Sequence, residues 1–142
     1  MAAAIYLVDS GPLVAAADQT EPHHAWAVAQ LRSLAPPLLT CEAVISETAF
    51  LLQRARLPAA MPMLMAERGI LQVESAVRSI EDAAALRQLM VKYSNVPMSF
   101  ADACLVRMAA RFPGAQLLTF DSDFRIYRTA DQRAIPLLAP SL

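Results

Sequence analysis

The sequence predicts an α/β domain of three layers, in which helices flank a mostly parallel sheet of about five strands. Short apolar runs alternate along the chain with longer segments whose apolar residues recur at helical spacing. The first run, residues 4–8, is continuously apolar, which is typical of a parallel strand covered on both faces. Because strands and helices alternate, we expect helices on both faces of the sheet. With 142 residues and no linker or repeat, the chain is expected to form a single domain over residues 1–142.

The first half of the chain is predicted to hold three strands and four helices. Ser10-Gly11-Pro12 follows the first strand and starts a short helix, because proline is favoured in the first helical turn. A second helix begins near Pro22 and ends before Pro36-Pro37, since proline does not continue a helix. The remaining segments are a strand at 38–40, helices at 42–56 and 58–68, and a strand at 70–73.

The second half is predicted to hold two helices and two strands. Ser79 and Asp82 form a capping pattern at the start of a helix over residues 79–93. Another helix covers residues 99–111 and ends at Pro113-Gly114. The last segments are a strand at 116–120, a turn or helix start at 121–124, and a strand at 135–138.

The composition excludes several classes of protein. A hydrophobic fraction of 56% with 18% charged residues excludes a disordered chain. The longest uncharged apolar stretches are far shorter than the ~20 residues of a membrane span, and Asp9 interrupts the first apolar run too early for a secretory signal. We therefore expect a soluble, cytoplasmic protein. The net charge of −1 gives no overall attraction to nucleic acid.

Four acidic residues stand out because each lies where a carboxylate is costly without a positive partner. Asp9 and Asp121 each follow a strand that is expected to be buried, and Glu47 and Asp102 lie on apolar stretches of helices. Ligands of open α/β sheets bind at the carboxyl ends of the strands, where both aspartates are expected. Hard divalent cations such as Mg²⁺ and Mn²⁺ prefer oxygen ligands. We therefore hypothesise a metal pocket that is used to hydrolyse phosphodiesters.

Local structural roles are the alternative explanation for three of these positions. Asp9 can cap a helix, and Asp102 can complete a capping box with the serine three residues earlier. Asp121 and Asp123 can form an Asx turn. Glu47 is harder to explain in this way, because its neighbours are apolar and no Lys or Arg lies three or four residues away. Each acid alone leaves the choice open.

Taken in chain order, four motifs carry a family resemblance. They are Val8-Asp9-Ser10, Glu47 within a helix, Ser99-Phe100-Ala101-Asp102-Ala103 and Thr119-Phe120-Asp121-Ser122-Asp123-Phe124. In this order, and in a chain this short, they resemble the PIN-domain family. More narrowly, they look like the VapC-like ribonuclease toxins of bacterial toxin–antitoxin pairs. The resemblance covers nearly the whole chain.

The resemblance implies a fold, an activity and partners. The fold is a five-stranded parallel sheet, and the activity is that of an endoribonuclease that depends on Mg²⁺ or Mn²⁺. The implied mechanism is attack of metal-bound water on an RNA phosphate, which leaves a 5′-phosphate and a 3′-hydroxyl. The implied partners are an RNA substrate, a small antitoxin protein and a second copy of the chain in a homodimer.

The resemblance also assigns roles to individual residues. It places Asp9, Glu47, Asp102 and Asp121 in the catalytic acidic centre, and it implies metal binding by Asp9, Asp102, Asp121 and Asp123. Ser10 and Thr119 resemble the hydroxyl residues that support this centre. Two further residues are candidates because of their position alone. Arg125 and Arg128 follow the acidic turn and can reach substrate phosphates, although solvated surface arginines are an equal alternative.

Two other classes of function are weighed against the ribonuclease. A phosphoryl-handling module is one: a response-regulator receiver needs a Lys after the last strand, and none follows residues 135–138. A phosphatase of the haloacid-dehalogenase type needs Asp-x-Asp after the first strand, whereas Asp9 is followed by Ser10-Gly11. The third class is a PIN-like binding protein without catalysis, against which the presence of all four acids argues.

Overall fold

The structure, a computed structural model, describes residues 4–141. The strands are β1 (Tyr6–Val8), β2 (Leu38–Cys41), β3 (Leu71–Glu74), β4 (Gln116–Leu118) and β5 (Leu137–Leu138). They form one sheet in the order β3-β2-β1-β4-β5, and every pair of neighbours is parallel. The expected parallel sheet of five strands is therefore confirmed. β1 lies at its centre.

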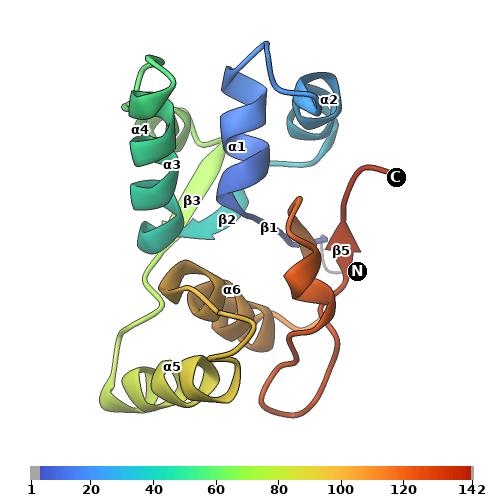
Figure 1. The fold of residues 1–142 in the computed structure, drawn as a ribbon. Helices are drawn as coiled ribbons and strands as arrows, with labels where there is room; N and C mark the ends of the chain where they lie inside the picture. The colour runs from blue at the N-terminus through green and yellow to red at the C-terminus, as the bar shows by residue number, and fades with distance from the viewer. Residues whose placement is uncertain (1–3, 142) are drawn as a thin grey trace.

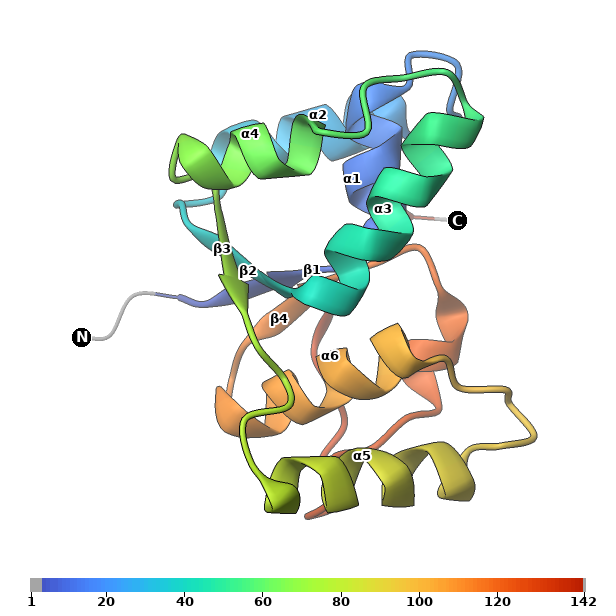
Figure 2. The same ribbon diagram turned by 90° about the vertical axis from the view of Figure 1, so that its left-hand side faces the viewer.

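Helices cover both faces of this sheet. They are α1 (Ser10–Ala17), α2 (His24–Ser33), α3 (Glu42–Arg54), α4 (Met61–Glu67), α5 (Ile80–Lys92) and α6 (Phe100–Arg111), and η1 (Ser122–Arg125) is a short 3-10 helix. Figures 1 and 2 show α1 to α4 on one side of the sheet and α6 on the other, with α5 outside α6. α3 also contacts α6, which brings the two layers together at one edge of the sheet.

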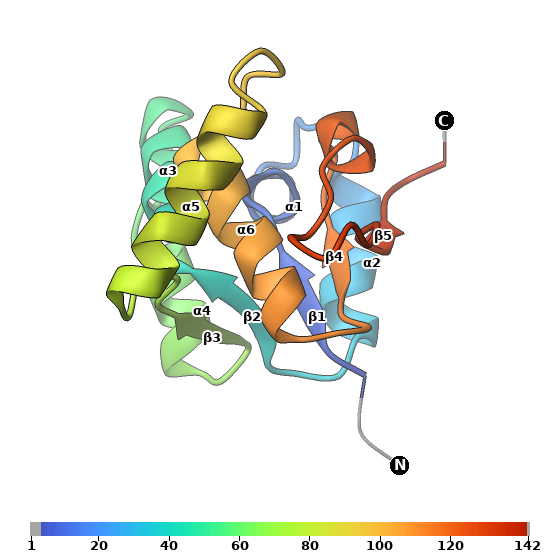
Figure 3. The same cartoon turned by 90° about the horizontal axis from the view of Figure 1, so that it is seen from below.

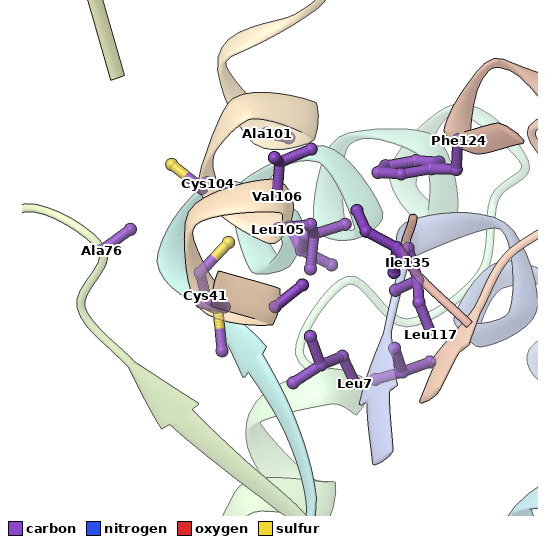
Figure 4. Packing of buried hydrophobic residues seen from close by; sticks show 14 of the residues in the cluster. Leu7, Cys41, Ala76, Ala101, Cys104, Leu105, Val106, Leu117, Phe124 and Ile135 are labelled. Atoms are coloured by element: carbon purple, nitrogen blue, oxygen red, sulfur yellow. The ribbon is translucent and has the colours of Figure 1, made fainter. Parts of the chain in front are cut away.

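The core forms between the central strands and α6. Leu7 of β1 and Leu117 of β4 are fully buried, and Leu105 of α6 packs in the same cluster (Figure 4). Burial on both faces explains why β1 is continuously apolar and why the two buried residues of β4, Leu117 and Leu118, are adjacent leucines. Each fully buried leucine stabilises the fold by about 1.5–3 kcal/mol through the removal of apolar surface from water.

The predicted elements are all present, and the differences lie at their ends. The strand expected over residues 116–120 ends at Leu118, although the Thr119 N–H still donates to the Leu138 carbonyl at 3.2 Å. The helix expected over residues 58–68 begins at Met61, after a turn in which the Met61 N–H donates to the Pro58 carbonyl. Within residues 4–141, no helix is both long enough and apolar enough to span a membrane.

Leu117 provides a direct test of where the core lies. Leu117→Ala removes a side chain that is 0% exposed, and we expect the free energy of unfolding to fall by about 2–5 kcal/mol. Leu64→Ala, at a residue of α4 that is 43% exposed, is the matched control and is expected to cost less than about 1 kcal/mol. Urea unfolding measures both, and equal losses would show that the central strands do not form the core.

Candidate active site

The site begins at the carboxyl ends of the two central strands. Asp9 directly follows β1, and its backbone N–H donates to the carbonyl of Leu118, the last residue of β4, at 2.9 Å. The Asp9 side chain is only 7% exposed. Its Oδ1 accepts a hydrogen bond from the Ser10 backbone N–H at 2.8 Å, and its Oδ2 accepts one from Thr119 Oγ1 at 2.8 Å. Asp9 therefore caps α1 and is also fixed to the neighbouring strand.

Thr119 connects two of the acidic residues. Its hydroxyl donates to Asp9 Oδ2, and the same oxygen accepts from the Asp121 backbone N–H at 3.0 Å. Because Thr119 is almost fully buried, its hydroxyl is held in this arrangement. Ser10 supports Asp9 through its backbone N–H, whereas Thr119 supports it through its side chain. The two residues expected to support the acidic centre thus both contact Asp9.

Asp102 has a local role and a place in the site at the same time. It completes a capping box at the start of α6: its backbone N–H donates to Ser99 Oγ at 3.0 Å, and its Oδ2 accepts from the Ser99 N–H at 3.2 Å. The same Oδ2 accepts from the Tyr127 hydroxyl at 3.2 Å. The capping role that the sequence offered as an alternative is therefore real, and it fixes the carboxylate at the edge of the site.

All four acids line one cleft of about 280 Å³. The lining residues are Asp9, Ser10, Gly11, Glu47, Asp102, Phe120 and Asp121. The expectation that each acid would lie in buried surroundings is wrong for Glu47 and Asp121, which are exposed. On α3 the buried stripe is Val44, Thr48 and Leu52, so that Glu47 lies beside the stripe instead of within it. Asp121 stands at the start of η1, past the end of the buried strand.

The electrostatics of the cleft show that the acids interact with one another. The pKa of Asp9 is raised from 3.8 to about 6, mainly by burial. The hydrogen bonds from Thr119 and Ser10 oppose this rise, and the charges of Asp102 and Glu47 add to it. Burial also raises the pKa of Asp102, and the charge of Asp121 adds to this effect. The cleft is therefore a region of unbalanced negative charge.

These donors fit a hard divalent cation. The cleft offers four carboxylates and no histidine or cysteine, which is the ligand chemistry of Mg²⁺ or Mn²⁺. In residues 4–141, no group of three or more His, Cys, Asp or Glu side chains is arranged to enclose a metal ion. Mg²⁺ commonly binds through one or two carboxylates and keeps several waters, so the donor set suits an open site of that kind.

The remaining candidates lie around the cleft. Asp123 does not line it; its backbone N–H donates to Asp121 Oδ1 at 2.9 Å. Arg125 lines an adjoining hollow that shares Phe120 and Asp121 with the cleft. Arg128 lines a different pocket, and its Nη1 donates to the backbone carbonyls of residues 125–127. The two arginines, each expected to be able to reach a substrate phosphate, thus lie in different surroundings.

Sequence reasoning missed two features of the site. Tyr127 is fully buried and donates its hydroxyl to Asp102, from a segment 25 residues further along the chain. Gly11 lies against the Phe120 ring, and a Cβ at this position would be 3.0 Å from Phe120 Cδ2. The close contact of Gly11 with Phe120 explains why a glycine follows the first acidic motif. Neither contact leaves a short-range signal, because both depend on how distant segments pack.

Comparison with known proteins gives a family match. A family model described as the PIN domain matches residues 6–130, which include all four acids of the cleft. No curated protein sequence matches the chain significantly.

Solved structures share the fold at low sequence identity. VapC20 of Mycobacterium tuberculosis, described as a sarcin–ricin loop cleaving toxin, has a TM-score of 0.71 and 22% identity, over 83% of this chain and 91% of that chain. A toxin–antitoxin complex from Klebsiella pneumoniae has a TM-score of 0.61 and 16% identity, and the match covers 84% of this chain and 89% of that chain. VapBC2 of Rickettsia felis, bound to a DNA fragment from its promoter, has a TM-score of 0.61 and 11% identity, and the match covers 96% of this chain and 99% of that chain.

The raised pKa of Asp9 predicts how stability depends on pH without divalent cations. Because the folded-state pKa of about 6 exceeds the unfolded value of 3.8, the folded protein binds this proton more tightly. Protonated Asp9 therefore contributes to the free energy of unfolding, and this contribution is complete below about pH 3.8 and is lost as the pH rises through 6. The total change is on the order of 3 kcal/mol.

Urea unfolding in EDTA at several pH values between 4 and 7.5 measures this loss. The free energy of unfolding of the native protein is expected to fall relative to that of Asp9→Asn as the pH rises, since asparagine carries no proton to lose. Asparagine can keep the contact with Thr119 if the hydroxyl accepts instead of donates. If the free energy of unfolding depends on pH in the same way for both proteins, ionisation of Asp9 does not destabilise the fold.

Proposed function

This chain belongs to the PIN-domain family, and we propose that it is a metal-dependent endoribonuclease that acts as the toxin of a toxin–antitoxin pair. The observation that carries the proposal is the convergence of Asp9, Glu47, Asp102 and Asp121 on one cleft at the carboxyl edge of the sheet. The shared fold with a structure described as a sarcin–ricin loop cleaving toxin supports RNA as the substrate class. We propose that residues 1–142 act as a single domain.

The proposed metal is Mg²⁺ or Mn²⁺. Asp9, Asp102 and Asp121 would hold it directly or through water, with Asp123 as an outer neighbour. A divalent cation in this cleft supplies positive charge at the scissile phosphate and makes water a better nucleophile at neutral pH. Burial is the main cause of the raised pKa values of Asp9 and Asp102, and the neighbouring carboxylates add to it. These raised values support the assignment, because a cation would stabilise the charged carboxylates.

The side chains have distinct proposed tasks. Asp9 is held in place by Thr119 and the Ser10 N–H, so its position is set before substrate arrives. Glu47 is exposed and forms no ion pair within residues 4–141, so its carboxylate can accept the proton of the attacking water. The water oxygen bonds to phosphorus as the bond to the 3′-oxygen breaks. The products are a 5′-phosphate and a 3′-hydroxyl that takes its proton from solvent.

Substrate and protein partners extend the proposal. Arg125 lines the hollow that adjoins the acidic cleft, and we assign it to a substrate phosphate next to the scissile bond. A small antitoxin protein is the proposed inhibitor, which is supported by the shared fold with two structures described as toxin–antitoxin complexes or VapBC assemblies. A homodimer in the cytoplasm is the proposed state of the protein.

Substitution of Asp9 tests the proposed activity. Asp9→Asn is expected to lower cleavage of RNA in Mg²⁺ by at least about 100-fold, because it removes the best-fixed charge around the cation. Mapping of 5′ ends after incubation with total RNA measures cleavage, and circular dichroism checks the fold. Asp18→Asn, at a partly exposed residue whose carboxylate bonds only to Thr20 in a local turn, is the matched control and is expected to cleave normally. Unchanged cleavage by Asp9→Asn would contradict the proposal.

Tyr127 is predicted to position Asp102 for metal binding. Tyr127→Phe removes the hydroxyl that donates to Asp102 Oδ2, and we expect the Kd for Mn²⁺ to rise by about 10-fold, as for other residues that orient metal ligands. Calorimetric titration with Mn²⁺ measures this without any RNA.

Tyr93→Phe is the matched control for this substitution. The Tyr93 ring packs against Tyr127, but its hydroxyl accepts from the Arg128 backbone N–H and contacts no acid of the cleft. Both variants are expected to lose on the order of 1 kcal/mol of stability, which is typical of a lost hydrogen bond. Equal Mn²⁺ affinities in the two variants would show that Tyr127 has only a structural role.

A further inference from the structure

A second pocket, outside the acidic cleft, gathers positive charge. It lies between α5, α6 and the loop of residues 128–132, and its volume is about 200 Å³. Figure 3 shows α5 and α6 side by side, with the red segment that follows η1 running next to α6. Three cationic side chains from three separate segments line the pocket: Lys92, Arg107 and Arg128. Of the described residues, no Asp or Glu is part of the lining.

Arg128 is held in place before any ligand binds. Its Nη1 donates to the carbonyls of Arg125 at 2.7 Å, Ile126 at 3.2 Å and Tyr127 at 2.9 Å. These bonds involve only one nitrogen of the guanidinium. Their acceptors are uncharged carbonyl groups, so the positive charge of Arg128 is not neutralised. A fixed arginine loses little side-chain freedom when it binds an anion, so the contact is preorganised.

The other two cations are also only partly neutralised. Lys92 is the last residue of α5, and its Nζ lies 5.2 Å from the centre of the Tyr93 ring. Arg107 pairs with Asp82 at 3.2 Å, but Arg111 shares the same carboxylate oxygen at 3.7 Å. One negative charge thus faces two guanidinium groups. In the part of the chain that the structure describes, neither Lys92 nor Arg128 forms an ion pair.

The remaining walls suit an anion that carries an organic group. Gln88 and Gln132 add polar atoms, and Leu89 and Val106 add apolar surface. The Thr129 hydroxyl is already bonded to Asp131, an exposed acid of the same loop whose charge is paired with Arg133. Gln132 has a φ of +67°, a conformation that residues other than glycine seldom adopt. The turn that contains it is closed by hydrogen bonds between the backbones of residues 129 and 133 and of residues 129 and 132. This turn holds Gln132 in the lining of the pocket despite the strain.

We propose that this pocket is a phosphate-binding subsite for single-stranded RNA, at a distance from the scissile bond. The inference rests on the proposed ribonuclease function. The acidic cleft repels an RNA backbone, and the chain as a whole carries a charge of −1, so affinity for RNA requires a positive region outside the cleft. Tyr127 contacts Asp102 of the cleft while the next residue, Arg128, lines this pocket, so one segment borders both sites.

RNA binding by the inactive Asp9→Asn protein in EDTA tests the subsite apart from cleavage. Fluorescence anisotropy with a labelled single-stranded oligonucleotide gives the Kd at several salt concentrations. Adding Lys92→Glu is expected to raise the Kd at least about fivefold and to reduce the slope of log K against log salt by about 0.7, the contribution of one phosphate in a single strand. Lys92→Gln is expected to give a smaller change in the same direction.

Arg87→Glu is the matched control, because Arg87 is an exposed cation of the same helix that lines a different, apolar pocket. It is expected to change the Kd less than Lys92→Glu does and to leave the slope unaltered. Equal effects of the two charge reversals would overturn the subsite. Inorganic phosphate can also be tested for protection of the protein against thermal unfolding. If Lys92→Glu abolishes this protection but leaves RNA binding unchanged, the pocket binds phosphate and the assignment to RNA is overturned.

The outcome separates the subsite from the activity. If the native protein cleaves RNA but Lys92→Glu binds RNA as Arg87→Glu does, the proposed function stands and the subsite falls. If the protein cleaves no RNA in Mg²⁺ or Mn²⁺ but the difference between the two variants persists, the ribonuclease proposal falls and the pocket remains a site for nucleic-acid phosphate.

Discussion

The hydrogen bond from Thr119 to Asp9 is the interaction on which the rest of the site depends. It joins residues that are 110 positions apart in sequence, at the carboxyl ends of the two central strands. A buried carboxylate is costly unless hydrogen bonds or a cation stabilise its charge. Thr119 and the Ser10 N–H supply part of this stabilisation, yet the pKa of Asp9 stays at about 6. The fold thus holds Asp9 in a position where a bound cation would be stabilising.

The order of the strands explains why distant residues meet at this point. β1 lies between β2 and β4, so the segments that follow β1 and β4 leave the sheet side by side. α3 and α6 contact each other across the same edge and bring Glu47 and Asp102 to the cleft. Asp102 also caps α6, and its place in the capping box sets the direction of its carboxylate. Helix capping and the geometry of the site therefore depend on the same atoms.

Most of the fold was predictable from sequence, because hydrophobic spacing and proline positions determine where strands and helices begin and end. The position of Asp9 was predictable for the same reason, since it ends a continuously apolar run. The exposure of Glu47 was not, because it depends on which face of α3 packs inward. The contacts of Tyr127 with Asp102 and of Phe120 with Gly11 were also missed, because Tyr127 and Phe120 lie in loops, whose path has no periodic pattern.

We propose that the acidic cleft binds a divalent cation through Asp9. The most direct test is a crystal of the protein grown with saturating Mn²⁺, in which anomalous scattering locates the ion. We expect one peak in the cleft, with a carboxylate oxygen of Asp9 about 2.1 Å away, as is usual for small divalent cations. A map with no ion in this cleft, or with Mn²⁺ bound only elsewhere on the protein, would contradict it.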